Sequence, residues 1–201
     1  TTKPVVNTTF NVTSPVVNDV INFSGNVTDL AGLLMVNITY NISGVITYVN
    51  FSGLTSTTYS AYNVTLALGC IETCVINFTM YATDTNNNVK QNSTILKVND
   101  VTKPIVNTTF NITSPLENDV INFSGNMTDL AGLISANITY NISGIITYIN
   151  FTSLSSTAYS AYNVTKLAGG PGSVINFTLY ATDSSNNVKQ NSTLITIRDV
   201  T

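Results

Sequence analysis

The sequence predicts an all-β chain made of two tandem sandwiches of about seven strands each. Three observations lead to this prediction. The chain contains a long internal repeat, its apolar residues alternate with a period of two, and clusters of Gly, Asn, Asp and Pro separate the alternating stretches. Such alternation is typical of half-buried antiparallel strands, and no stretch of useful length has apolar residues at helical spacing.

The repeat covers nearly the whole chain of 201 residues. Lys3–Gly69 reappears as Lys103–Gly169 with 17 of 67 positions changed, and six of these changes are Val/Ile or Ser/Thr exchanges. A period near one hundred residues is the size of a complete domain and not of a solenoid turn. The predicted domains are residues 1–102 and 103–201. The chain begins and ends within the motif that joins the two predicted domains, so we expect it to be a window of a longer array. A finished two-domain protein is the alternative.

Seven strands are predicted in the first unit, each bounded by turn residues. The β-branched first strand ends before Pro15, and Asp19 precedes the second. The segment from Asp29 to Gly32 separates the second strand from the third, and Gly44 separates the third from the fourth. Gly53 closes the fourth strand. The predicted ranges are Val5–Val12, Val20–Val27, Leu34–Ile42, Val45–Phe51, Tyr59–Val64, Val75–Thr83 and Val89–Val98.

Seven short strands in about one hundred residues are typical of an immunoglobulin-like sandwich. Three segments carry a resemblance to prokaryotic Ig-like cell-surface repeats. Asn18–Leu33 resembles their second strand and the following turn, Phe78–Asn88 resembles their Tyr-x-Ala-Thr-Asp-x-x-Gly-Asn motif, and Asp100–Pro104 resembles their Asp-x-Thr-x-Pro linker. Asn87 replaces the motif's glycine, and asparagine tolerates the left-handed backbone that a glycine there would adopt. The resemblance implies tandem modules of stalks, adhesins or S-layer proteins.

Composition excludes several classes of function. Charged residues make up 8% of the chain and the net charge is −3, against about 25% charged residues in an ordinary domain. No basic face is available for nucleic acid. Histidine is absent, which removes a Ser-His-Asp triad and an ordinary zinc site. We predict no catalytic residue and no enzyme. No apolar run reaches the roughly 18 residues that a membrane span requires, so no membrane insertion is expected in this segment.

The strongest signal besides the fold is the density of Asn-x-Ser/Thr sequons. Of 28 asparagines, 20 lie in such a sequon. A strand with an Asn/Thr outer face and an apolar inner face creates part of this excess by alternation alone. A coat of N-glycans would also explain the scarcity of charge, because glycans supply solubility. The predicted glycosylation sites are Asn7, Asn11, Asn22, Asn26, Asn37, Asn41, Asn50, Asn63, Asn77, Asn92, Asn107, Asn111, Asn122, Asn126, Asn137, Asn141, Asn150, Asn163, Asn176 and Asn191.

The two cysteines, Cys70 and Cys74, lie between the fifth and sixth predicted strands. The second unit has Gly170, Pro171, Gly172 and Ser173 at this place, which is a turn sequence. A disulfide that closes the first loop would replace that turn. We therefore predict a Cys70–Cys74 disulfide and an oxidising, extracellular compartment.

Six aspartates are weak candidates for a metal site. They recur in pairs, one in each unit, and could offer carboxylate oxygens to calcium. The alternative is that each aspartate accepts hydrogen bonds from the backbone of its own turn. Calcium is therefore not favoured, and no other cofactor is predicted. The candidates are Asp29, Asp84, Asp100, Asp129, Asp183 and Asp199.

The recurrent tyrosines are interpreted as core or cross-strand packing groups and not as a platform for sugars. In the first unit these residues are Tyr40, Tyr48, Tyr59, Tyr62 and Tyr81.

Together these observations predict a structural repeat of an extracellular, heavily N-glycosylated filament or stalk, with an archaeal cell surface suggested by dense sequons and few charges. Its partners would be copies of itself or further repeats of the same chain. A segment such as Val5–Val12 could complete the sheet of a neighbour by strand addition. The alternative function is a spacer or binding repeat of a surface adhesin or S-layer-type protein, stiffened by calcium.

Overall fold

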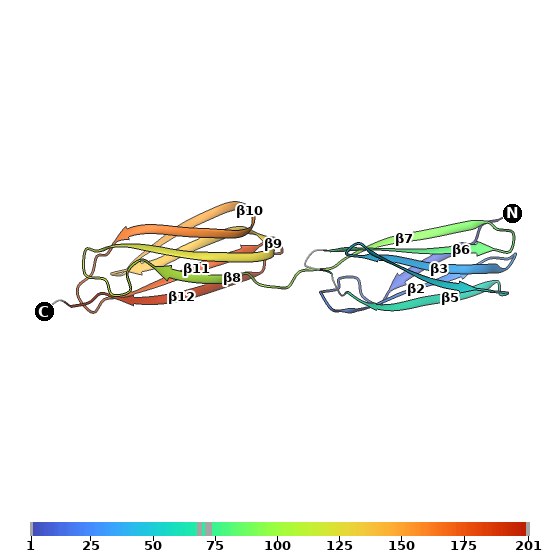
Figure 1. The fold of residues 1–201 in the computed structure, drawn as a ribbon, viewed down its shortest axis with the longest axis horizontal. Coiled ribbons are helices and arrows are strands. Elements are labelled where there is room, and N and C mark those ends of the chain that lie inside the picture. The colour runs from blue at the N-terminus through green and yellow to red at the C-terminus, as the bar shows by residue number, and fades with distance from the viewer. Residues whose placement is uncertain (1, 68–69, 71–73, 200–201) are drawn as a thin grey trace. The chain divides into compact units, whose positions relative to one another are not determined.

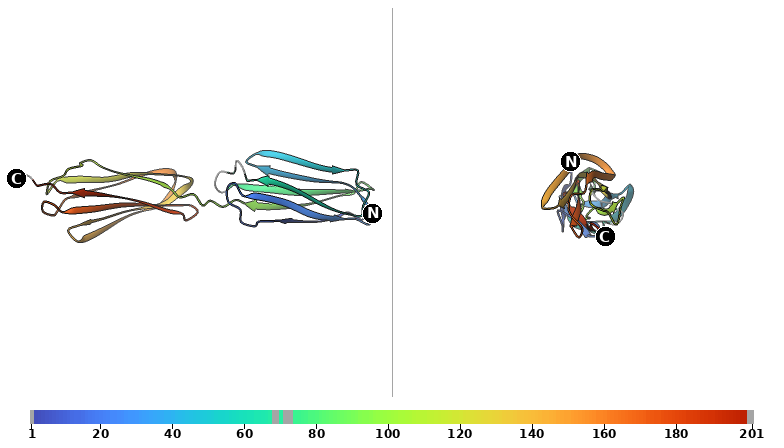
Figure 2. Two further views of the ribbon diagram at one scale, coloured as in Figure 1. Left: turned by 90° about the horizontal axis from the view of Figure 1, so that it is seen from below. Right: turned by 90° about the vertical axis from the view of Figure 1, so that its left-hand side faces the viewer.

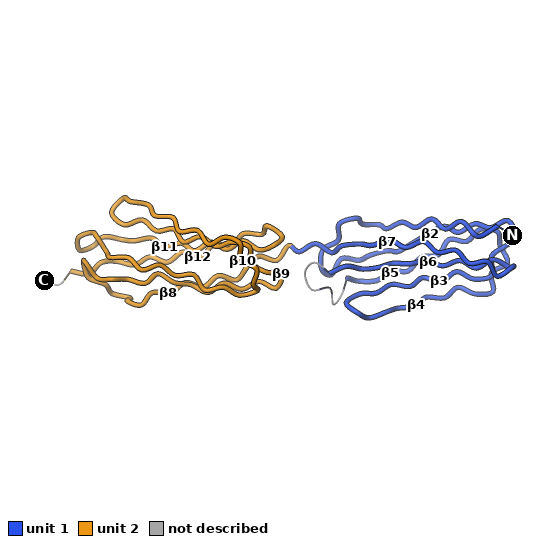
Figure 3. The backbone as a smooth tube through the Cα atoms, turned by 90° about the horizontal axis from the view of Figure 1, so that it is seen from above, with its two compact units in different colours: residues 1–100 blue, residues 101–201 orange. Residues whose placement is uncertain are grey.

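The fold was derived from a computed structural model, which describes residues 2–67, 70 and 74–199. All regular structure in these residues is β-strand, as the alternating pattern predicts. Contacts divide the chain into two compact units, residues 1–100 and 101–201 (Figure 3). Among the described residues, no helix has the length and hydropathy needed to cross a bilayer.

The first unit has two sheets that face each other (Figures 1 and 2). One sheet has the order β1-β2-β5 and the other β4-β3-β6-β7, and all pairs are antiparallel. Inward residues of both sheets are apolar, and the alternation along each strand sends the Asn and Thr residues outward. The strands are β1 Val5–Phe10, β2 Val20–Thr28, β3 Leu33–Ile42, β4 Val45–Ser52, β5 Thr58–Leu66, β6 Val75–Asp84 and β7 Val89–Lys97.

The second unit repeats this path but divides it into fewer strands. Leu133 pairs with Ser156 in the ladder. One continuous strand pair therefore crosses the segments whose counterparts in the first unit separate β2 from β3 and β4 from β5. In the first unit the equivalent Leu33 N–H donates to Ser56 O at 2.9 Å without a ladder pair. The expected count of about seven strands therefore describes the first unit and not the second. The strands of the second unit are β8 Ile105–Phe110, β9 Val120–Ile142, β10 Ile145–Lys166, β11 Val174–Asp183 and β12 Val188–Thr196.

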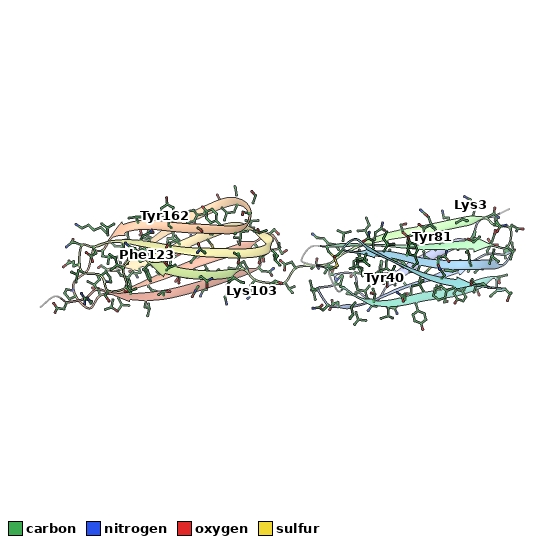
Figure 4. The ribbon with its side chains drawn as sticks, in the orientation of Figure 1. Lys3, Tyr40, Tyr81, Lys103, Phe123 and Tyr162 are labelled. Carbon is green, nitrogen blue, oxygen red and sulfur yellow. A yellow bond between two sulfur atoms is a disulfide. The ribbon has the colours of Figure 1, made fainter. Side chains whose placement is uncertain are left out.

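Aromatic rings fill the middle of each core. In the first unit Phe23 and Phe78 come from opposite sheets and stack with ring centroids 4.7 Å apart. Phe10 meets both rings edge-on, at 5.2 and 5.5 Å. The second unit has the same arrangement, with Phe123 against Phe177 at 5.1 Å (Figure 4 labels Phe123). Gly25 allows Asn7 and Met80 to approach β2 closely, because an added Cβ would lie 2.5 Å from Asn7 O and 2.8 Å from the Met80 side chain.

Side chains join the two sheets along one side of each unit. The Asn92 amide of β7 donates to Val6 O at 3.3 Å and to Thr8 Oγ1 at 3.2 Å, and Thr8 and Thr94 hydroxyls lie 3.3 Å apart. These contacts advance along β1 and β7 in the same direction, so the two strands are parallel neighbours. We call this contact line the seam.

A parallel seam fixes where the chain enters and leaves a unit. The chain enters beside Asn92 at the start of β1, and it leaves after Asn99, whose N–H donates to Pro15 O at 2.7 Å. Entry and exit therefore lie at opposite ends of the unit. In the second unit Asn191 donates to Val106 O at 3.0 Å and Arg198 N–H donates to Pro115 O at 2.8 Å, which gives the same geometry.

Asn87 has φ 62° and its counterpart Asn186 has φ 68°. Asparagine therefore adopts the left-handed backbone expected where the resembling motif has glycine.

Candidate functional site

All 20 sequon asparagines lie among the described residues, and none of them is buried. Their side chains nevertheless differ in what they contact. Attachment of a glycan replaces one hydrogen of the Asn Nδ2 nitrogen, so the contacts of this atom decide how well a site suits modification. The structure divides the sequon asparagines into residues whose Nδ2 donates a hydrogen bond within the fold and residues whose Nδ2 does not.

Three sequon asparagines of the first unit use Nδ2 inside the fold. Asn92 holds the seam, and Asn63 donates to the Tyr40 hydroxyl at 3.0 Å, which links β5 to the opposite sheet. Asn11 donates to Val20 O at 3.0 Å while its Oδ1 accepts from Asn22 N–H at 2.7 Å. Asn11 thus extends the β1–β2 ladder by one step. Sequence alternation did not separate these residues from the other sequon asparagines.

Other sequon asparagines have exposed amides without such bonds. Asn7, Asn50 and Asn77 make no side-chain hydrogen bond to any described residue. Asn26 accepts from the Ser60 hydroxyl at 2.7 Å through Oδ1, and this bond does not involve its Nδ2. These positions fit a modified surface.

Strand register brings sequons together in pairs that the sequence did not predict. Asn37 of β3 lies opposite Asn50 of β4, Asn41 of β3 lies opposite Asn77 of β6, and Asn7 of β1 lies opposite Asn26 of β2. Directly opposed residues have Cβ atoms about 4.5–5.5 Å apart. Two glycans do not fit at that spacing, so each pair offers one usable site.

Four of the candidate aspartates accept hydrogen bonds from backbone N–H groups that lie two to four residues further along the chain. Asp84 is buried, its Oδ1 accepts from Asn86 and Asn88 N–H groups at 2.9 and 2.8 Å, and its Oδ2 accepts from Asn88 Nδ2 at 2.7 Å. Burial acts to raise the pKa of the Asp84 carboxyl, but the hydrogen bonds from Asn88 and Asn86 outweigh burial and hold that pKa below its ordinary value of 3.8. Asp29 Oδ1 accepts from Ala31 N–H at 2.7 Å.

The second unit repeats these hydrogen bonds. Asp183 accepts from Ser185 and Asn187 N–H groups at 2.8 Å, and Asp129 accepts from Ala131 N–H at 2.9 Å. Asp100 is the last residue of the first unit, and Asp199 is exposed near the end of the second. Asp29, Asp84, Asp129 and Asp183 therefore accept the backbone hydrogen bonds that were the alternative to calcium. Calcium binding, which the sequence did not favour, stays untested.

Cys70 and Cys74 are joined by a disulfide, with Cα atoms 5.2 Å apart. Val98 N–H donates to Cys74 O at 2.9 Å, and in the second unit Ile197 N–H donates to Ser173 O at 3.0 Å. The crosslink and the glycine-rich turn thus support the same contact with the residue that follows the last strand of the unit.

The tyrosines do not all pack in the core. Tyr40 is buried, with 8% of its surface exposed, as expected for a core residue. Tyr48 is 66% exposed and Tyr62 is 64% exposed, and their counterparts Tyr148 and Tyr162 are similar. Tyr48 and Tyr62 are therefore not core residues, and cross-strand packing on the outer faces stays the prediction for them. Figure 4 labels Tyr40, Tyr81 and Tyr162.

No known protein family and no curated protein matches this chain. Solved structures do resemble it. A tetra-tandem repeat from the extending region of a large adhesion protein matches 96% of this chain and 49% of its own length, with a TM-score of 0.56 and 19% identity. The chain therefore spans about half of that structure. At this identity the likeness concerns the fold, and it supports an arrangement of tandem β-sandwich repeats.

Two further structures align over most of the chain with lower scores. A 1.5-MDa bacterial ice-binding adhesin matches 98% of this chain and 65% of its own, with 14% identity and a TM-score of 0.39. Fibronectin(III)-like modules of Clostridium thermocellum CbhA match 96% of this chain and 94% of their own, with 13% identity and a TM-score of 0.35.

Proposed function

We propose that this chain is a spacer of an extracellular surface protein, in which each β-sandwich adds a folded, load-bearing length to the polypeptide. It carries out no catalytic step. The parallel seam between β1 and β7 is the observation that supports this function, because it places entry and exit at opposite ends of each unit. The fold likeness to the extending region of an adhesion protein supports the same proposal.

The seam also explains how a unit would resist extension. Tension applied at the two ends of a unit pulls β1 and β7 in opposite directions along their length. Six ladder pairs between β1 and β2, together with the Asn92 and Thr8 hydrogen bonds, must then break together. A shear geometry of this kind loads many bonds at once and suits a spacer.

Polymerisation by strand addition has less support. The segment expected to be able to join a neighbouring sheet was Val5–Val12. Its strand β1 already pairs with β2 of its own unit and contacts β7 through the seam. A donor-strand filament would require β1 to leave both contacts. Assembly into a filament, and an archaeal source, stay predictions that the comparisons do not support.

We further assign a glycan coat to the exposed sequons whose Nδ2 makes no bond within the fold, such as Asn7 and Asn107. The disulfide fits the oxidising compartment in which such a coat is added. Sequons that hold the fold, such as Asn92 and Asn11, stay unmodified. Glycopeptide mass spectrometry of the chain secreted from a glycosylating host tests this division, and occupancy of Asn92 with an empty Asn7 would contradict it.

Force spectroscopy of the two-unit chain tests the spacer function. We expect two discrete unfolding events. Each event should lengthen the chain by about 300 Å, because about one hundred residues extend at roughly 3.3–3.6 Å each while a folded unit spans only tens of ångströms. Smooth extension without discrete events would show that the units bear no load, and the proposal would fail.

A further inference from the structure

The outer face of the sheet β4-β3-β6-β7 contains a hollow of about 300 Å³ that the spacer function does not explain. Thr39 and Thr79 form its floor, on the adjacent strands β3 and β6. Tyr48 of β4 and Tyr81 of β6 rise on either side of β3. Short side chains between longer ones create the hollow, which we call the tyrosine groove.

The chemistry of the groove matches a neutral sugar. None of the side chains that line it carries a charge at neutral pH. Tyrosine rings offer an apolar face to the C–H groups of a pyranose and a hydroxyl for its polar edge. The floor is held in place, since Thr79 Oγ1 and Ser93 Oγ lie 2.9 Å apart. A fixed polar floor between aromatic walls is a small, partly apolar site with a few placed polar groups.

Two sequon asparagines reach the groove, Asn41 and Asn77, and they lie opposite each other on β3 and β6. Asn41 is half-buried, and its Oδ1 accepts from Gly44 N–H at 2.8 Å, which ties it to the turn after β3. Asn77 is exposed and makes no side-chain hydrogen bond to any described residue. Asn77, Thr79 and Tyr81 share one face of β6, so a group attached to Asn77 can lie over the floor against both tyrosines.

The second unit keeps the whole set. The 17 positions that differ in the first part of the repeat include none of the residues that line the groove. Asn141 repeats the bond of Asn41 by accepting from Gly144 N–H at 2.9 Å, and Asn176 repeats the exposed position of Asn77. The counterparts of the lining residues are Thr139, Tyr140, Asn141, Ile146, Tyr148, Asn176, Thr178 and Tyr180.

We infer that Asn77 and Asn176 carry N-glycans whose first sugars pack in the tyrosine grooves. Asn41 and Asn141 then stay unmodified, because they lie directly opposite Asn77 and Asn176 and each opposed pair has room for one glycan. The inference rests on the proposed glycan coat and names a modification site and its protein contact. In the modification, Asn Nδ2 attacks the anomeric carbon of a lipid-phosphate-linked oligosaccharide. A C–N bond forms, the C–O bond to the donor phosphate breaks, the lipid phosphate leaves, and Nδ2 loses one proton to solvent.

The test uses the full chain secreted from a yeast host that modifies Asn-x-Ser/Thr. Glycopeptide mass spectrometry measures occupancy, and tetranitromethane measures the access to each tyrosine by nitration. We expect Asn77 to be occupied and Asn41 empty. Tyr48 should react several-fold more slowly in the glycosylated chain than after enzymatic release of the glycans. Tyr62 is equally exposed but lies on the other sheet beside Asn26, so it serves as the control for removal of the Asn77 glycan alone. Its rate should be the same in the glycosylated chain with and without Asn77→Gln.

Variants make the same comparison without enzymatic treatment. Asn77→Gln should abolish the protection of Tyr48, whereas Asn7→Gln should leave it intact. An occupied Asn77 beside a Tyr48 that reacts at its unprotected rate would overturn the packing. An empty Asn77 beside an occupied Asn7 would overturn the site, and the glycan coat would stand. Empty sequons throughout would overturn both, and the force measurement would still test the spacer function separately.

Discussion

The seam gives the sharpest test of how this fold is held together. Replacing Asn92 by Ala removes an amide that donates to Val6 O at 3.3 Å and to Thr8 Oγ1 at 3.2 Å across the two sheets. Each lost hydrogen bond of this kind costs about 0.5–1.5 kcal/mol net, so the free energy of unfolding of the first unit should fall by about 1–3 kcal/mol. The second unit keeps its own Asn191 contact and should be unaffected.

Urea denaturation of the chain from a host without N-glycosylation measures this change. The chain contains ten tyrosines and no tryptophan, so tyrosine fluorescence reports both units. With a urea m-value of about 1–3 kcal/mol/M, the midpoint of the first unit should move down by roughly 1 M and separate from that of the second. Asn7→Ala is the matched control, because Asn7 is an exposed sequon asparagine without a bond, and changes at such sites stay within about 0.5 kcal/mol. Equal midpoints for the two variants would refute the structural role of Asn92.

Three further predictions concern the core, the turn and the crosslink. Gly25→Ala should destabilise the first unit by about 1–3 kcal/mol, because the new Cβ would meet Asn7 O and Met80; Gly170→Ala, which has open space around it, is the control, and equal urea midpoints would contradict the packing argument. The hydrogen bonds that lower the pKa of the Asp84 carboxyl favour its ionised form. Their contribution to stability should be fully present above the unfolded pKa of about 3.9 and be lost as pH falls through the lower folded pKa. Urea titrations between pH 2 and 6 should therefore show that the free energy of unfolding depends less on pH in Asp84→Asn than in the unchanged chain. An equal pH dependence of the two chains would argue against this role of Asp84. Reduction of the Cys70–Cys74 disulfide should lower the stability of the first unit by at most about 2 kcal/mol, since the closed loop is short; calorimetry with and without reductant would show this, and an equal loss in the second unit would contradict it.

The sequence by itself determined the repeat and the strands of the first unit to within a few residues. Val75–Thr83 was expected as a strand, and β6 runs from Val75 to Asp84. These features are local, because alternation with period two and turn residues define a strand without knowledge of its neighbours. The sequence did not predict that the strands of the second unit are continuous, because this depends on the pairing of Leu133 with Ser156, two residues from segments distant in the sequence.

Only the tertiary structure decided what each asparagine and tyrosine does. Asn77 and Asn92 lie in equivalent sequons, yet one amide is exposed while the other ties β7 to β1. Tyr40 and Tyr48 recur equally in the repeat, yet one is buried and the other forms a wall of a groove. Alternation assigns a residue to a face of its strand. The strand that lies beside that face, and therefore the partner of the side chain, follows from the order of strands in the two sheets, which local sequence does not encode.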